Sequence, residues 1–121
     1  MRHTEATWEY GQEDHARQLT EKGKRQALDL AIWLSAQSYH PTQALVSDAT
    51  RTQQTFLALN QKCPVAALPK LYLAEPEILM LEIQKVETEC LLVLAHNPGL
   101  AELATKMASE SPSHHQFFNY P

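Results

Sequence analysis

Residues 90–95, which read Cys-Leu-Leu-Val-Leu-Ala, constrain the fold of this chain more than any other feature of its sequence. A strand with one face in water alternates apolar and polar side chains, whereas this run is apolar throughout. Such a run is typical of a central parallel strand that is covered on both faces. It is far shorter than the roughly 20 apolar residues that a membrane-spanning helix needs. The run therefore predicts a buried strand in an α/β sheet and no membrane-spanning segment.

Further strand and helix patterns alternate along the chain. Short apolar segments at 44–47 and 65–68 predict two more strands, the second from a weaker pattern. The predicted helices run from a Thr20 cap to about Ser35, from Thr50 to Asn60, from Pro76 to about Val86, and from the Asn97-Pro98-Gly99 turn to about Met107. This order favours an α/β fold whose sheet has mostly parallel strands.

Length and charge limit what the chain can do. A chain of 121 residues has the usual length of one domain, so we expect residues 1–121 to form a single domain. The net charge of −4 leaves no excess of positive charge to follow a phosphate backbone. Nucleic acid is therefore not an expected partner. An anion site must instead be a local cluster of Arg, His and backbone N–H groups.

The N-terminal segment and the cysteines bear on cellular location. No apolar run follows Arg2, so the sequence shows no signal peptide, and we expect a cytoplasmic protein. Cys63 and Cys90 have no close metal-ligand spacing. A single disulfide would fit them, but buried free thiols in a reducing cytosol are the better interpretation.

Basic side chains follow the predicted strand ends. Arg2-His3 opens the chain, Arg51 comes after the strand that ends at Ser47, and His96 comes directly after the 90–95 run. In open α/β sheets, ligands bind outside the carboxyl ends of the strands. We therefore expect these side chains to meet at one edge of the sheet.

These residue types suit attack on a phosphoryl group. An imidazole can be unprotonated near neutral pH, as a nucleophile must be. The planar guanidinium groups of arginine balance the charge on the phosphoryl oxygens, and a second, protonated histidine would add another charged donor. Taken singly, a His or Arg is more often solvated than functional, and six histidines leave room for coincidence. The residues around each candidate must therefore distinguish a functional side chain from a solvated one.

Five segments carry a resemblance to a known family. In chain order they are the Arg2-His3 pair, segment 14–23 (DHARQLTEKG), segment 47–55 (SDATRTQQT), segment 71–77 (LYLAEPE) and segment 93–100 (VLAHNPGL). The last four are similar to the D-x-x-R-x-L-T-x-x-G, S-x-A-x-R-[AT]-x-Q-T, L-Y-x-A-x-P-E and V-x-x-H-N-P-G-L segments of SixA-type phosphohistidine phosphatases, in the histidine phosphatase superfamily. The Arg-His pair alone would be a weak signal. Five matches in the right order, over nearly the whole chain, are a strong one.

The resemblance implies a fold and a set of roles. The implied fold is phosphoglycerate mutase-like, with three α/β/α layers around a mostly parallel sheet. His3 would be the nucleophile that becomes phosphorylated. The residues implied to bind the phosphoryl oxygens are Arg2, Arg51 and His96. We expect this chemistry to need no metal and no cofactor.

Two further residues are secondary candidates for substrate binding. Arg17 would reach the phosphate from the loop that carries it, or it would only tie that loop down through Asp14. Asn97 would contact the substrate, or it would only stabilise its turn.

Three features depart from the family's pattern. Thr4 stands where the family usually has Gly or Ala. Only Met1 precedes the Arg-His pair, where the family has a hydrophobic strand, and the chain stops at Pro121, before a further family strand. We therefore expect a domain that lacks the first strand and the C-terminal strand or strands. His3 would then lack the strand that normally positions it.

Candidates for a general acid and for a metal site are weak. Glu75 and Glu77 fit favourable charges at a helix start better than they fit a catalytic acid. A phosphoramidate leaving group needs less help from an acid than an alcohol does, which agrees loosely with phosphohistidine as substrate. The His114-His115 pair has no evident third ligand, so no metal site is expected there.

The sequence thus predicts a metal-independent phosphatase that hydrolyses phosphohistidine or a phosphomonoester through a covalent intermediate on His3. Its partner would be a phosphorylated protein or a small phosphorylated substrate. Two alternatives stay open. One is a catalytically inactive domain that binds phosphate or a phosphoprotein, which the missing first strand favours. The other is a phosphatase for a small metabolite such as a sugar phosphate.

Overall fold

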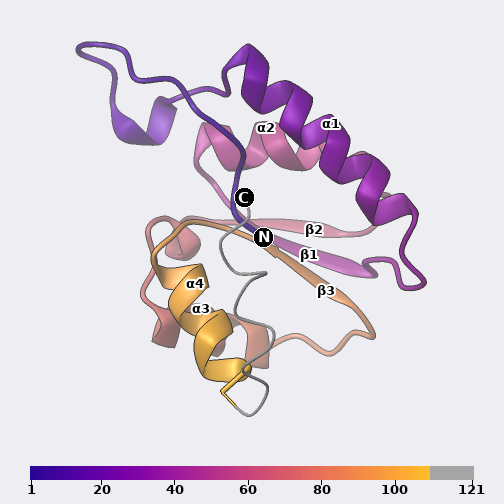
Figure 1. The fold of residues 1–121 in the computed structure, drawn as a ribbon. Helices are drawn as coiled ribbons and strands as arrows, with labels where there is room; N and C mark the ends of the chain where they lie inside the picture. Colours follow the sequence, from indigo (N-terminus) through magenta and orange to yellow (C-terminus); the bar gives the residue numbers. More distant parts are fainter. Residues whose placement is uncertain (110–121) are drawn as a thin grey trace.

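Strand β1 (Gln43–Ser47) forms the centre of a parallel sheet in the computed structural model, which describes residues 1–109. β2 (Val65–Leu68) pairs with one edge of β1 and β3 (Leu91–Leu94) with the other (Figure 1). The carboxyl ends of all three strands therefore lie at the same side of the sheet. The predicted parallel strands are confirmed, but β1, rather than the 90–95 run, is the central one of the three.

The first residues of the chain extend the sheet beyond β3. Arg2 forms a parallel bridge with Ala95. The Ala95 amide donates to the Met1 carbonyl at 3.0 Å, and the His3 amide donates to the Ala95 carbonyl at 3.4 Å. Backbone hydrogen bonds to the residue after β3 therefore hold His3 in place.

Helices cover both faces of the sheet. α1 (Glu21–Ser35) and α2 (Thr50–Leu59) pack together on one face, and α3 (Pro76–Gln84) and α4 (Gly99–Met107) pack together on the other (Figure 1). Successive side chains of β1 enter the two cores in turn. The core under α1 and α2 contains Leu34, Ala44, Val46, Phe56, Leu59, Leu92 and Leu94, and the other contains Leu45, Leu71, Leu79, Ala95 and Leu103. The predicted three-layer α/β/α fold is confirmed.

Helix boundaries follow the signals in the sequence. The Thr20 hydroxyl accepts a hydrogen bond from the Gly23 amide at 2.9 Å and so caps α1. Pro76 is the first residue of α3, where its missing N–H leaves no helical hydrogen bond unmade. Asn60 ends α2 in the left-handed conformation, with a φ of 52°.

The polar segment 4–17 is a loop that contains one short 3₁₀-helix, η1 (Asp14–Ala16). This loop folds back on the start of α1, where the Thr7 amide donates to the Gln18 carbonyl at 2.7 Å. In Figure 1 it projects beyond the end of α1, above the carboxyl edge of the sheet. The fold therefore places η1 beside the strand ends.

Gly23 permits a close approach between this loop and α1. A β-carbon at Gly23 would lie 2.0 Å from the carbonyl oxygen of Glu5. A glycine inside a helix ordinarily weakens it. The structure shows instead that the loop backbone occupies the space that any larger residue would need.

The remaining predictions concern single features. Cys63 and Cys90 are free and half-buried, in agreement with their interpretation as thiols. Among residues 1–109, no helix is both long enough and apolar enough to cross a membrane. His114 and His115 lie outside the described residues.

We predict that Gly23→Ala destabilises the protein by roughly 1–3 kcal/mol, the usual range for overpacking a tight contact. In an unhindered helix the same change would stabilise by up to about 1 kcal/mol. The sign of the change in the free energy of unfolding, measured in urea, therefore tests the contact. Asp29→Ala, at an exposed position of α1, is the matched control. A Gly23→Ala protein at least as stable as its parent would contradict the close approach.

Candidate active site

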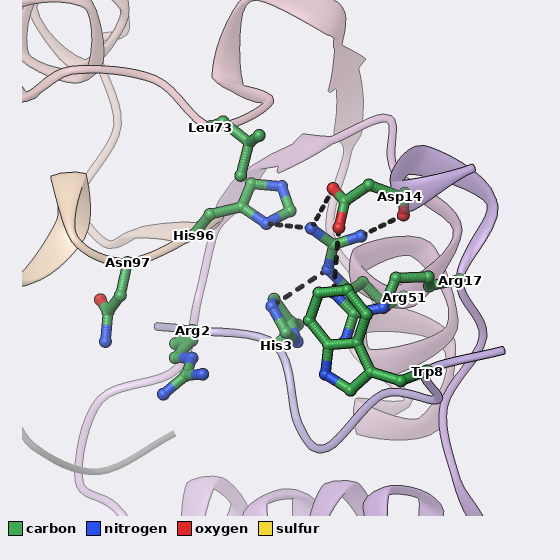
Figure 2. A pocket seen from close by; sticks show the side chains of 9 residues that line it. All are labelled: Arg2, His3, Trp8, Asp14, Arg17, Arg51, Leu73, His96 and Asn97. Atoms are coloured by element: carbon green, nitrogen blue, oxygen red, sulfur yellow. Dashed lines mark hydrogen bonds and ion pairs between the residues drawn. The ribbon is translucent and has the colours of Figure 1, made fainter. Parts of the chain in front are cut away.

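A pocket of about 270 Å³ lies at the carboxyl edge of the sheet (Figure 2). It is lined by Arg2, His3, Trp8, Asp14, Arg17, Arg51, Leu73, His96 and Asn97. All six residues that the sequence singles out are in this set. The structure therefore brings together the N-terminal segment, the 4–17 loop, the start of α2 and the residues that follow β3.

One ring nitrogen of His3 makes a hydrogen bond to the backbone. Nδ1 lies 2.7 Å from the backbone carbonyl oxygen of Thr4, which can only accept, so Nδ1 carries the proton. The lone pair is then on Nε2, which accepts a hydrogen bond from Arg51 Nε at 3.2 Å. This tautomer makes Nε2 the nucleophilic atom of a neutral imidazole.

Thr4 is itself fixed on both sides. The residue is buried, its hydroxyl donates to the Gly23 carbonyl at 2.7 Å, and its amide donates to Thr55 Oγ1 at 3.3 Å. These contacts fix the carbonyl group that orients His3. The departure from Gly or Ala at this position therefore has a structural role.

Arg51 lies at the centre of the site and is only 2% exposed. Besides its bond to His3, its Nη1 donates to the Asp14 carbonyl at 2.6 Å and its Nη2 to Asp14 Oδ2 at 3.0 Å. Nη2 also lies 3.4 Å from Nδ1 of His96. Figure 2 shows the guanidinium between the two histidines and Asp14. One buried side chain thus links three segments that are far apart in the sequence.

His96 is buried and makes a hydrogen bond through each ring nitrogen. Because Arg51 can only donate, Nδ1 of His96 is the acceptor in that contact. Nε2 then carries the proton and donates to Ser47 Oγ at 2.8 Å. The rings of His96 and His3 are neighbours, with centroids 5.3 Å apart.

Both histidines are neutral at physiological pH. Burial lowers the pKa of His3 to about 4, against the opposing effect of the Thr4 carbonyl and with help from the nearby guanidinium groups. Burial and the Arg51 charge lower the pKa of His96 to about 3. Without a ligand, His96 is therefore neutral rather than protonated, and the positive charge of the pocket comes from arginine.

Asp14 is the carboxylate of the pocket lining. Its Oδ2 accepts from the Tyr72 hydroxyl and from Arg51, and its Oδ1 accepts from Arg17 Nη1 at 2.9 Å. The Tyr72 bond, and then the two arginines, hold the pKa of Asp14 well below its usual range although burial opposes them. Asp14 therefore stays ionised and orients both guanidinium groups.

Sequence reasoning notes the Asp14 tie to Arg17, which the structure shows, but misses Tyr72 and the link to Arg51. Both missed contacts join Asp14, in segment 14–23, to a residue of another segment that carries the family resemblance: Tyr72 in 71–77 and Arg51 in 47–55. The signal was present in the motifs. What the motifs do not show is which of their side chains meet.

The two remaining arginines of the pocket differ in how they are held. Arg17 Nε donates to the Thr7 carbonyl at 2.6 Å, and its guanidinium lies 3.4 Å from the centre of the Trp8 ring. The Arg2 side chain is exposed, and within residues 1–109 it forms no hydrogen bond or ion pair. Asn97 is half-buried, and its side-chain amide likewise forms no hydrogen bond within residues 1–109. Arg2 and Asn97 are therefore available to a ligand.

Carboxylates and metal ligands are scarce around the pocket. Neither Glu75 nor Glu77 lines it, and Glu77 pairs with Lys106 at 3.2 Å on the surface. In the part of the chain that the structure describes, no three His, Cys, Asp or Glu side chains are grouped to hold a metal ion. A polar site rich in arginine is what remains.

Comparison with known proteins bears on the family of this chain. A sequence profile of the histidine phosphatase superfamily (branch 1) matches residues 1–89. An uncharacterised protein of Mycobacterium tuberculosis is 34% identical over 113 residues, which cover 92% of this chain and 72% of that protein.

Two solved structures share the fold. A candidate phosphohistidine phosphatase SixA from Agrobacterium tumefaciens superposes with a TM-score of 0.86 at 27% identity, over 98% of this chain and 81% of that one. The protein histidine phosphatase SixA in complex with tungstate superposes with a TM-score of 0.78 at 26% identity, over 87% of this chain and 72% of that one.

We predict that His3 and His96 titrate well below pH 6, because protonation would add a buried positive charge beside Arg51. Their pKa values of about 4 and about 3 mean that each ring stays neutral until the pH falls to those values. NMR titration of the ring C2 protons measures both midpoints, with the exposed His40 as a reference signal. A midpoint between pH 6 and 7 for either residue would be incompatible with this electrostatic environment.

Proposed function

The chain belongs to the histidine phosphatase superfamily, and we propose that it is a phosphatase whose nucleophile is Nε2 of His3. The observation that carries the proposal is the hydrogen bond from Nδ1 to the Thr4 carbonyl. It leaves the lone pair on Nε2, in a pocket that three arginines line. An uncharged nucleophile beside fixed positive charges is what attack on an anionic phosphoryl group requires.

The proposed reaction has two steps. In the first, His3 Nε2 forms a bond to phosphorus, and the bond to the leaving group breaks with its electron pair going to the leaving atom. That atom takes a proton from solvent. In the second, water adds to phosphorus, the bond to Nε2 breaks, and a proton returns to solvent. Orthophosphate leaves and His3 recovers its lone pair.

Each remaining site residue receives a role in this scheme. Arg51 and Arg2 would bind phosphoryl oxygens, with Arg17 and Asn97 as further donors at the edge of the site. The negative charge of a bound phosphoryl group would raise the pKa of His96. His96 would then bind an oxygen through a protonated nitrogen. Because this scheme uses arginine charges where other phosphatases use metal ions, we propose that no metal takes part.

We infer that the substrate is phosphohistidine or a phosphomonoester. The similarity to the protein histidine phosphatase SixA supports the first, and a phosphorylated protein would then be the partner. That relative was solved with tungstate, a tetrahedral oxyanion like phosphate. Asp14 is held ionised, so it is a poor proton donor. A leaving nitrogen that protonates readily suits such a site better than an alkoxide does.

We predict that the protein releases orthophosphate from a phosphohistidine protein and from an aryl phosphate with EDTA present. His3→Asn should abolish release, because it removes the nucleophile. Arg51→Lys should lower kcat/KM at least about 10-fold, since a hydrogen bond to a charged group contributes about 1.5–3 kcal/mol. Arg25→Ala, at an exposed position of α1, is the matched control.

Three outcomes would contradict the proposal. They are turnover by His3→Asn, unchanged kinetics in Arg51→Lys, and loss of activity in EDTA that Mg²⁺ or Zn²⁺ restores. A parent protein that binds phosphate without turnover would favour the alternative of an inactive binding domain. Far-UV circular dichroism of each variant separates loss of function from loss of fold.

A further inference from the structure

Two apolar side chains stand out in a pocket that is otherwise polar. Trp8 is 82% exposed and Leu73 is 55% exposed, and both line the same pocket as His3. In Figure 2 they lie on opposite sides of the Arg51 guanidinium. Because Arg51 and His96 are buried while these two are exposed, the floor of the pocket is polar, and Trp8 and Leu73 lie at its rim with the exposed Arg2.

The Trp8 ring is held in place from one side. The Arg17 guanidinium lies 3.4 Å from the ring centre, and Arg17 is in turn bound to the Thr7 carbonyl and to Asp14. A cation over an indole face is a favourable contact. Since most of the residue remains in solvent, the opposite face of the ring is free to meet a ligand.

Leu73 has an unusual backbone conformation. Its φ is 50°, in the left-handed region that leucine seldom adopts. The surrounding structure imposes this conformation, because Leu71 is fully buried and the Ala74 amide donates to its carbonyl at 3.3 Å. Residues kept in such conformations tend to cluster at functional sites. The strain here holds an exposed leucine at the mouth of the pocket.

The geometry of phosphoryl transfer says what this rim would meet. The attacking atom and the leaving atom lie roughly in line on opposite sides of phosphorus. If His3 Nε2 attacks from the floor, the leaving group would point outward, toward the rim that Trp8 and Leu73 help to line. Apolar surfaces there would remove water from sugar hydroxyl groups without replacing their hydrogen bonds, which is unfavourable. A flat ring loses little on entering and gains contact with the indole.

We propose that Trp8 and Leu73 form a leaving-group subsite that selects phosphoryl groups attached to a flat, uncharged ring. The ring is an imidazole, bonded to phosphorus through nitrogen, or a phenol, bonded through oxygen. This inference rests on the proposed function, because it names the substrate class of the same site. It assigns to the rim a selectivity for the leaving group, whereas the proposed role of the arginines is to bind phosphoryl oxygens.

The test compares substrates that differ only in the ring. N-phosphoimidazole and phosphoramidate both break a P–N bond, but only the first has a ring. Trp8→Ala should lower kcat/KM for N-phosphoimidazole roughly 3- to 10-fold, the range that one aromatic contact contributes. Its kcat/KM for phosphoramidate should stay within about twofold of the parent value. Trp8→Phe should restore most of the loss. Phenyl phosphate, assayed in parallel, shows whether imidazole or phenol is the better leaving group.

Leu73→Gly separates the subsite from the strain of the backbone. Glycine adopts a positive φ without penalty, so this variant should be at least as stable as the parent. It should still lose activity selectively on N-phosphoimidazole. Tyr10→Ala is the matched control, because Tyr10 is a fully exposed aromatic residue of the same loop that does not line the pocket. Tyr10→Ala should leave kcat/KM unchanged for both substrates.

A binding measurement keeps this test independent of turnover. Calorimetry with phenylphosphonate and methylphosphonate, which are not hydrolysed, should show tighter binding of the phenyl compound in the parent and a smaller preference in Trp8→Ala. Two results would overturn the subsite. One is an equal loss of kcat/KM for N-phosphoimidazole and phosphoramidate in Trp8→Ala, and the other is equal binding of the two phosphonates by the parent. Failure to turn over any substrate, with the ring preference intact, would overturn the proposed function and leave the subsite standing.

Discussion

The buried guanidinium group of Arg51 is the interaction on which the rest of the site depends. A buried charge is costly unless its donors are paired, so the chain must bring acceptors to it. It does so from three directions, with His3 beside β3, Asp14 in η1 and His96 after β3. The fold of the 4–17 loop, the bridge at the chain start and the turn after β3 all serve that requirement. One arginine at the first turn of α2 thereby assembles the pocket.

The same group sets the electrostatics of the pocket. Its charge and the burial around it keep both imidazoles neutral, which leaves His3 with a usable lone pair over the whole physiological pH range. Asp14 balances part of the positive charge and, because Tyr72 also donates to it, cannot readily accept a proton. In the proposed scheme the site is divided by function: the neutral Nε2 of His3 would bond to phosphorus, arginine would bind its oxygens, and apolar side chains would contact the leaving group at the rim.

Much of this arrangement was predictable from local sequence. The apolar runs give the strands, and Thr20 and Pro76 mark helix starts, because these signals act over a few residues. The six site residues follow from short motifs. What the sequence does not reveal depends on segments that meet only in the fold: the Glu5 carbonyl against Gly23, the Tyr72 hydroxyl on Asp14, and the left-handed Leu73. The sequence does not reveal the low pKa of His96 for the same reason, since burial in the fold is its largest cause.

The central claim is that His3 attacks phosphorus through Nε2, and a trapped intermediate tests it most directly. The protein is mixed with a phosphohistidine substrate and quenched in base, because phosphohistidine is labile in acid. The peptides are then analysed by mass spectrometry and by ³¹P–¹H NMR. The account predicts one phosphoryl group on the peptide that contains His3, bonded to Nε2. Phosphorylation at His96, or at Nδ1 of His3, would contradict it.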